Sequence, residues 1–271
     1  MNANFHTHTV YCDGELTVEQ MIRAALQKGL DALGFSEHSY LSFDDFCMSR
    51  DGTFEYMREV RQLAQKYPEI DIYLGIEQDY YSEWIVPPEE FDFIIGAVHY
   101  VKSGGKIVSL DDGAQAQRQV VLDHFGGDYY AMAEVYFDTV AALADTPCDF
   151  IAHFDLCTKY NNLDPLAPLF DESHPRYVNA ALRAMDMLVS AGKPFEVNTG
   201  AMYRLGRPEP YPSAFFLREL HRRGAQVLLS SDSHDAQSLC YGFEDMKNLL
   251  RSCGFTHIKR LTRNGFVDVG L

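Results

Sequence analysis

Two histidines near the start of the chain, His6 and His8, are separated by one residue and followed by Asp13. Side chains two positions apart on a β-strand point to the same side, so both imidazoles can bind one metal ion. Only a short run of residues precedes the pair, which places it where a first strand ends and a loop begins. Catalytic residues of α/β proteins gather at such positions.

Other residues able to bind metals stand at the ends of later apolar runs, namely His38, Glu77, His99, His153, Asp232 and His234. A single histidine at a strand end is more often a hydrogen-bonded core or loop residue than a ligand. The joint pattern instead favours one shared metal site. Mixed imidazole and carboxylate ligands suit Zn²⁺, Mn²⁺ or Fe²⁺ better than Mg²⁺ or Ca²⁺.

Signatures of other catalytic classes are missing from the sequence. It holds no P-loop, no dinucleotide-binding glycine motif, no GxSxG and no HExxH, so nucleophilic serine or cysteine catalysis has no support. The remaining histidines are assigned no ligand role, although two stand in long loops and are kept as alternatives for substrate contact. They are His124, His174, His221 and His257.

The elements that must position these residues follow from an alternation of apolar runs with amphipathic stretches. Seven runs occur, at residues 3–6, 32–36, 71–76, 93–98, 149–153, 194–198 and 226–230. This alternation predicts an α/β fold, a parallel (β/α)7 barrel whose strand ends meet at one mouth. Thr17 and Gln20 form a capping-box pattern for the first helix, which Gly29 should end. Residues 101–127 and 155–175 are predicted to be long loops that serve as lids or substrate walls.

Bulk composition narrows the class of protein. A chain of 271 residues with 46% hydrophobic content predicts one domain over residues 1–271. The net charge of −16 argues against nucleic acid as a partner. Six scattered cysteines without a CxxC spacing predict reduced thiols. No signal-peptide pattern and no membrane-length apolar run occurs, so we expect a cytoplasmic protein without a membrane partner.

In their order along the chain, the candidate ligands resemble the motifs of the polymerase and histidinol phosphatase (PHP) superfamily. Its first motif matches His6-Thr7-His8 with Asp13, its second Glu37-His38, its third Glu77 and His99, its fourth His153 and its last Asp232-Ser233-His234. The resemblance covers essentially the whole chain. It implies a distorted (β/α)7 TIM-like barrel with a trinuclear metal site.

Further segments resemble the stand-alone histidinol-phosphate phosphatases of that superfamily, at residues 5–9, 11–14, 96–99, 153–156, 196–200 and 209–213. This implies a metal-dependent phosphomonoesterase of histidine biosynthesis, which hydrolyses L-histidinol phosphate to L-histidinol and phosphate. Two departures bear on the substrate. A small residue or serine followed by glycine is expected after Asn198-Thr199, but Gly200-Ala201 stand there. Basic residues are expected where Cys157-Thr158 stand, which leaves Lys159 as the cation of that segment.

The resemblance also implies a ligand set for three divalent cations, zinc, manganese or iron. One metal would be held by His6, His8, Glu77 and Asp232, a second by Glu77, His99 and His153, and a third by Asp13, His38 and His234. With a hydroxide and a phosphomonoester dianion, three divalent cations and three ligand carboxylates carry no net charge. This balance favours small phosphomonoesters over uncharged esters.

Candidate substrate contacts complete the expectations, with Glu77, Asp232 and Arg204 as the catalytic residues. Arg204 is predicted to bind two phosphate oxygens at once, with Lys159 as second candidate. Tyr100 is expected to line the pocket. An acidic wall should bind the ammonium of histidinol phosphate, with Asp79, Glu83 and Asp155 as candidates.

Two alternatives stay open at this stage. One is a PHP phosphoesterase for another monoester, such as a nucleotide, a nucleic-acid end or phosphotyrosine. The other is a non-catalytic metal-binding module, against which the complete ligand set argues, because a decaying site should first lose ligands.

Overall fold

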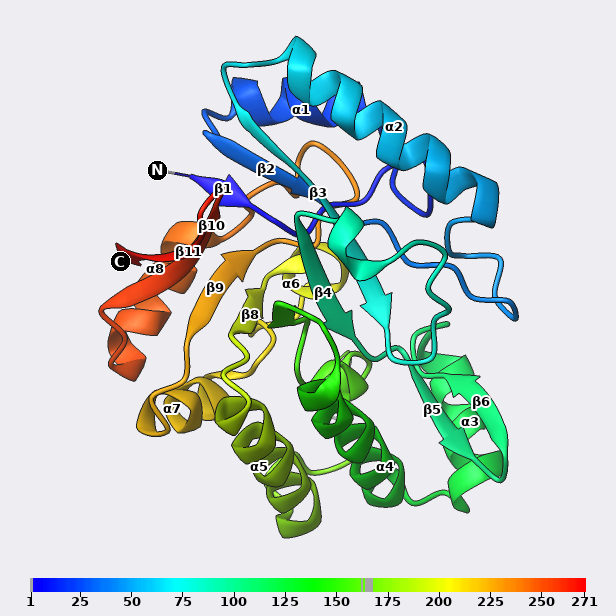
Figure 1. Ribbon diagram of the computed structural model, residues 1–271. Coiled ribbons are helices and arrows are strands. Elements are labelled where there is room, and N and C mark those ends of the chain that lie inside the picture. Colours follow the sequence, from blue (N-terminus) through cyan, green and yellow to red (C-terminus); the bar gives the residue numbers. More distant parts are fainter. Residues whose placement is uncertain (1, 162, 164–167) are drawn as a thin grey trace.

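Seven parallel strands form the central sheet of the computed structural model, which describes residues 2–161, 163 and 168–271. Their spatial order is β1-β2-β3-β4-β7-β8-β9, and Figure 1 shows them arranged around a common axis. Each strand overlaps one predicted apolar run, so the prediction of a distorted (β/α)7 barrel is confirmed. The strands are β1 (Ala3–Asn4), β2 (Ala32–Phe35), β3 (Asp71–Asp79), β4 (Phe93–Ala97), β7 (Phe150–Ile151), β8 (Phe195–Asn198) and β9 (Val227–Ser230).

The barrel closes through a seam between the residues that follow β1 and β9. Thr7 and Ser233 form an isolated parallel bridge. The His8 amide donates to the Ser233 carbonyl at 2.8 Å, and the Ser233 amide donates to the His6 carbonyl at 3.1 Å. Farther down, the Asn4 side chain donates to the Ser231 hydroxyl at 2.8 Å. The seam sets the first predicted ligands beside the last ones.

Helices cover the outside of the barrel (Figure 1). They include α1 (Val18–Gln27), α2 (Arg50–Lys66), α4 (Tyr129–Ala142), α5 (Pro175–Ser190), α7 (Ala214–Arg222) and α8 (Phe243–Cys253), with the short α6 (Gly200–Leu205) between β8 and α7. The predicted capping box of α1 is confirmed. The Thr17 hydroxyl accepts from the Gln20 amide, the Gln20 side chain accepts from the Thr17 amide, and Gly29 has φ +71°.

Aromatic side chains fill the barrel interior. Phe5, Tyr73, Phe93 and Phe150 belong to one buried cluster. The Phe93 ring has room because the neighbouring strand carries Gly75, where an added Cβ would lie 2.2 Å from Phe93 Cζ. A large ring opposite a glycine thus fills the space between strands at interior packing density.

A C-terminal hairpin, which the pattern of apolar runs does not predict, covers the amino-terminal end of the barrel. It consists of β10 (His257–Thr262) and β11 (Gly265–Gly270). The Phe266 ring lies 6.3 Å from that of Phe150. Arg260 pairs with Asp31 at 2.8 Å and Arg263 with Asp71 at 3.2 Å, beside the first residues of β2 and β3.

The prediction of a long loop over residues 101–127 is wrong. The segment forms a hairpin of β5 (Tyr100–Ser103) and β6 (Lys106–Ser109), followed by α3 (Ala114–Phe125). Gly104 and Gly105 have φ of +58° and +82°, and two such residues make the tight turn that antiparallel strands prefer. In the second predicted loop, residues 156–158 form the short helix η3 (Leu156–Thr158). Residues 162 and 164–167, including Pro165, lie outside the described residues.

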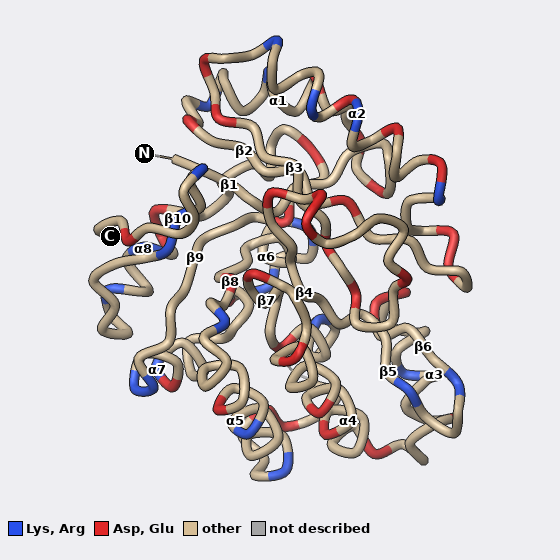
Figure 2. Tube along the Cα trace, in the orientation of Figure 1, with Lys and Arg blue, Asp and Glu red and all other residues tan. Residues whose placement is uncertain are grey.

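Charged residues of both signs are spread over the outer elements of the chain trace (Figure 2). All six cysteines are free thiols, as predicted. Among the described residues, no helix combines the length and apolarity that crossing a membrane requires.

Candidate metal centre

Glu77, in the carboxyl-terminal half of β3, lies among imidazoles from several strand ends. Its carboxylate oxygens lie 2.8 Å from His38 Nδ1 and 2.9 Å from His153 Nε2. Nε2 atoms of three further histidines lie 3.4 to 3.6 Å from the same carboxylate, those of His6, His8 and His99. Glu77 is 1% exposed. The barrel therefore converges five strand-end histidines on one buried carboxylate.

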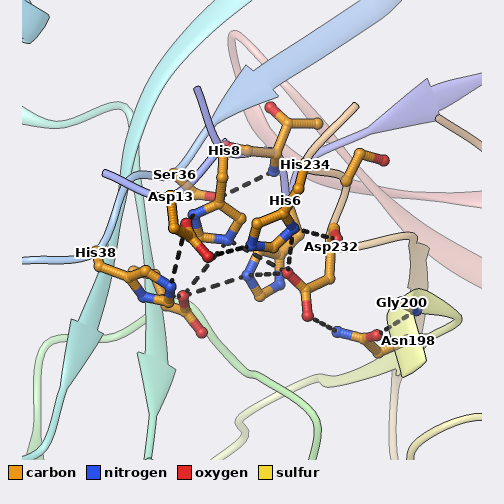
Figure 3. A network of polar contacts seen from close by, with 12 residues as sticks. His6, His8, Asp13, Ser36, His38, Asn198, Gly200, Asp232 and His234 are labelled. Carbon is orange, nitrogen blue, oxygen red and sulfur yellow. Dashed lines mark hydrogen bonds and ion pairs between the residues drawn. The ribbon is translucent and has the colours of Figure 1, made fainter. Parts of the chain in front are cut away.

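Two more carboxylates complete the cluster (Figure 3). Asp232 Oδ1 lies 3.3 Å from His8 Nε2 and 3.6 Å from His6 Nε2. Asp13 Oδ2 lies 2.7 Å from His234 Nε2, and its Oδ1 lies 3.7 Å from His38 Nε2. The structure thus brings all nine predicted ligands together in one cluster.

Unpaired buried atoms test whether these residues fit a metal. His6 Nε2 and His8 Nε2 are buried and make no hydrogen bond within the described chain. An unpaired buried polar group costs about 1–3 kcal/mol, so these atoms are expected to serve as ligands. In each of three groups of residues, the donor atoms all lie within 4.8 Å of one another. The groups are His8, Cys12, Asp13 and His38; His6, His8 and Asp232; and His38, Glu77 and His99. The mostly nitrogen and oxygen donor set fits divalent cations.

The pKa values of His8 and Glu77 favour the metal-binding forms, whereas the surrounding carboxylates outweigh burial and raise the pKa of His6, His38 and His99, so these imidazoles release protons when a metal binds. Burial, together with the neighbouring His234 and His38, lowers the pKa of His8 to about 3, so its imidazole is neutral. Burial alone would raise the pKa of Glu77, but His6 and His38 outweigh it and hold that pKa well below its usual range. A neutral imidazole and an ionised carboxylate are the metal-binding forms.

Behind the ligands stands a second layer of carboxylates to which the sequence analysis gave no role. Glu196 on β8 is fully buried. Its Oε1 lies 2.5 Å from His6 Nδ1, and its Oε2 accepts from the His153 amide at 2.8 Å. Glu37 accepts from the Thr9 hydroxyl at 2.6 Å and from the Cys12 thiol at 2.7 Å. A charged residue inside an apolar strand, such as Glu196 between Phe195 and Val197, is the signal that identifies this layer.

A cavity of about 380 Å³ opens onto the cluster. Three predicted substrate contacts line it, Arg204, Lys159 and Tyr100. Arg204 Nη2 donates to Asp232 Oδ2 at 2.9 Å, and Arg204 also contacts His234. Lys159 Nζ lies 2.5 Å from Asp111 Oδ1. The Tyr100 hydroxyl donates to Asp44 at 2.6 Å.

Of the three residues expected in the acidic wall of this cavity, the structure places only Asp79 there. Asp155 is fully buried and accepts from the Ser213 amide at 3.1 Å, away from the cavity lining. Glu83 is exposed and pairs with Arg50. Asp79 does line the cavity, but its carboxylate accepts from the amides of His99 and Tyr81. The other carboxylates of the wall belong to Asp44, Asp111 and Asp112.

The two loop histidines kept as substrate contacts lie elsewhere. His174 is the N-cap of α5, where its Nδ1 accepts from the Arg176 amide. His124 lies in the last turn of α3. Neither residue lines the cavity.

Comparison with known proteins supports the same architecture. Residues 4–200 match the family described as PHP domain. A Schizosaccharomyces pombe protein named "probable histidinol-phosphatase" is 27% identical over 95% of this chain and 89% of its own length. The histidinol-phosphatase of Bacillus subtilis is 24% identical over 88% of this chain and 96% of its own length.

Two solved structures share the fold. The crystal structure of a Listeria monocytogenes protein has a TM-score of 0.74 at 20% identity, covering 90% of this chain and 99% of the other. Histidinol phosphate phosphatase from Lactococcus lactis, complexed with zinc, L-histidinol and phosphate, has a TM-score of 0.71 at 20% identity, covering 98% of both chains.

Proposed function

This chain belongs to the PHP domain family, and from that premise we propose that it hydrolyses L-histidinol phosphate to L-histidinol and inorganic phosphate. The observation that carries the proposal is one cavity that joins a metal-type cluster, two cationic side chains and an acidic wall. Similarity to histidinol-phosphatases over most of the chain supports it. So does the zinc, L-histidinol and phosphate complex of the Lactococcus lactis protein, which has the same fold.

The proposed centre holds three divalent cations, zinc, manganese or iron. One is assigned to His6, His8, Glu77 and Asp232, a second to Glu77, His99 and His153, and a third to Asp13, His38 and His234. Two donor groups that share no residue support more than one ion: His6, His8 and Asp232 form one, and His38, Glu77 and His99 form the other. Glu77 would be a ligand of both the first and the second cation.

Bound divalent cations supply a nucleophile from water at neutral pH and neutralise the charge that develops on the leaving oxygen. The chain's own residues bind and orient the ester. The Arg204 guanidinium offers paired donors to two phosphoryl oxygens, and the Lys159 ammonium adds a third donor. The side chains of Arg204 and Lys159 have carboxylate partners, which hold them at the cavity wall. These partners are Asp232 for Arg204 and Asp111 for Lys159.

The acidic wall favours a substrate that is cationic at the end opposite its phosphate. Asp44 and Asp112 offer carboxylates at which an ammonium or a protonated imidazole gains charge-assisted hydrogen bonds. A nucleoside leaving group is uncharged at neutral pH and gains no such bond. This contrast supports histidinol phosphate over a nucleotide.

The test is phosphate release from histidinol phosphate against an aryl phosphate, a nucleoside monophosphate and phosphotyrosine, with Zn²⁺, Mn²⁺ and Fe²⁺ supplied separately. We expect kcat/KM to be highest for histidinol phosphate. Asp44→Asn should lower that preference relative to the aryl phosphate, whereas its exposed neighbour Asp45→Asn should leave it unchanged. A parent protein that prefers the nucleotide would contradict the assignment and leave a general phosphoesterase.

A further inference from the structure

Tyr211 is held rigidly at the cavity by its backbone and by its ring. It pairs with Asn198, at the end of β8, through two backbone hydrogen bonds of 2.7 and 3.0 Å. The Arg207 guanidinium lies 4.6 Å from the centre of the Tyr211 ring. The His153 ring stands edge-on to it with centroids 6.4 Å apart. The phenol therefore has little freedom to turn away.

The hydroxyl of this residue is left without a partner. Tyr211 is 2% exposed, and within the described part of the chain its hydroxyl makes no hydrogen bond. The residue lines the same cavity as Arg204 and Lys159. A buried hydroxyl that has lost its water contacts is destabilising unless an acceptor pairs with it. We therefore expect an acceptor to come from the cavity.

We propose that Tyr211 donates a hydrogen bond to a phosphoryl oxygen of the bound phosphomonoester and of the phosphate product. The inference rests on the proposed phosphomonoesterase function. It adds a neutral hydrogen-bond donor to the two cationic side chains, Arg204 and Lys159, that are assigned to the phosphate. Within an amino-alcohol phosphate ester, the ammonium has only donors to offer, and the oxygens bonded to phosphorus carry the negative charge, so they are the strongest acceptors.

The surroundings of the phenol agree with a donor role. Burial raises the pKa of the Tyr211 hydroxyl far above the neutral range, although Arg207 opposes the shift, so the proton stays in place. The charges of Asp111 and Arg204, which line the cavity, also act on this hydroxyl. A phenol needs no counter-charge in this position, unlike Arg204 and Lys159 with their carboxylate partners.

The chain supplies a matched control in Tyr177. This residue is 1% exposed, and its hydroxyl likewise makes no hydrogen bond within the described part of the chain. Its ring packs against Phe137 and Phe216 in the core and does not line the cavity. Replacing either tyrosine by phenylalanine removes one unpaired buried hydroxyl and no packing surface.

The experiment compares Tyr211→Phe and Tyr177→Phe with the parent in the metal-loaded protein, with inorganic phosphate as the probe. Calorimetry gives the phosphate Kd, and inhibition of aryl phosphate hydrolysis gives a second value. We expect Tyr211→Phe to weaken phosphate binding by about 10-fold or more, the size of a hydrogen bond to a charged group. Tyr177→Phe should bind phosphate like the parent. Metal content should match the parent in both variants, and Tm should not fall in either.

The outcomes separate this inference from the proposed function. Equal phosphate affinity in the two variants overturns the role of Tyr211. Loss of metal in Tyr211→Phe also overturns it, because the residue would then act through the metal centre. If the parent hydrolyses none of the esters but Tyr211→Phe alone binds phosphate more weakly, the proposed function fails and the phosphate contact stands.

Discussion

At the scale of single residues, Glu77 stands at the centre of the cluster, because imidazole nitrogens of five histidines lie within 3.6 Å of its two oxygens. Glu77→Gln keeps the shape and removes the charge. We expect metal content to fall and turnover to drop by at least about 10²-fold, because the two proposed cations would lose a shared anion. Elemental analysis and phosphate release measure both effects. The exposed Glu89→Gln is the control. Near-normal turnover with fewer than two metals per chain would contradict a trinuclear centre.

Glu196 acts one layer farther from the cavity. Its contact with His6 Nδ1 leaves Nε2 of that ring to serve as the ligand, so Glu196→Gln should weaken metal binding by roughly 10- to 100-fold. Competition with a chromophoric chelator measures the affinity. Glu89→Gln again serves as the control, and an affinity equal to that of the parent would show that Glu196 only fills space.

The difference between these two residues shows what sequence can predict about the site. Strand-end histidines are readable because the barrel converges strand ends, and the structure brings them together. Asp155 was expected at the rim because it follows His153 by two positions. The chain turns back there, with the Leu156 amide donating to the His153 carbonyl, and this local turn directs Asp155 toward Ser213. Distance along the sequence does not reveal such a reversal.

At the scale of elements, the barrel strands were predictable and the two hairpins were not. The barrel strands are buried along nearly their whole length and form continuous apolar runs. In β10 only Leu261 is buried, and β11 has no buried residue, so neither strand leaves a strong apolar pattern. The polar composition of the β5–β6 hairpin gives no apolar pattern that predicts its strands. Its Gly-Gly turn is nevertheless typical of a hairpin.

The packing of β3 against β4 gives a prediction for Gly75. Alanine at this position would place its Cβ 2.2 Å from the Phe93 ring, and overpacking a barrel interior typically costs about 1–3 kcal/mol. Urea unfolding of Gly75→Ala should show a loss of that size in the free energy of unfolding. Gly270→Ala, where the added Cβ meets no atom within 4 Å, should unfold like the parent. Equal stability of the two variants would mean that the Phe93 ring shifts freely.

At the scale of the whole molecule, the pH dependence of folding should carry the signature of Asp155. Burial raises the pKa of this carboxyl to about 7, against about 3.9 in an unfolded chain. Between these values the folded protein keeps a proton that the unfolded chain has lost. Stability therefore falls as pH rises through this window, by up to about 1.4 kcal/mol per pH unit, and levels off above it.

Asp155→Asn removes that contribution. The free energy of unfolding of the variant minus that of the parent should grow from about pH 4 to about pH 7 and then stay constant. Urea titrations of the chelator-treated protein at several pH values measure this difference. The exposed Asp123→Asn should show no such trend. A difference for Asp155→Asn that does not vary with pH would contradict the buried-proton account.

The seam of the barrel also has a consequence for the newly made chain on the ribosome. Asn4 and Ser231, joined across the seam, are 227 positions apart. At about 5–20 residues per second, synthesis of that stretch takes roughly 10 to 50 s. Throughout this interval His6 and His8 have been translated, whereas Asp232 and His234 have not. The complete centre therefore forms only after nearly the whole chain has been synthesised, and a nascent or truncated product that ends before β9 lacks the catalytic assembly.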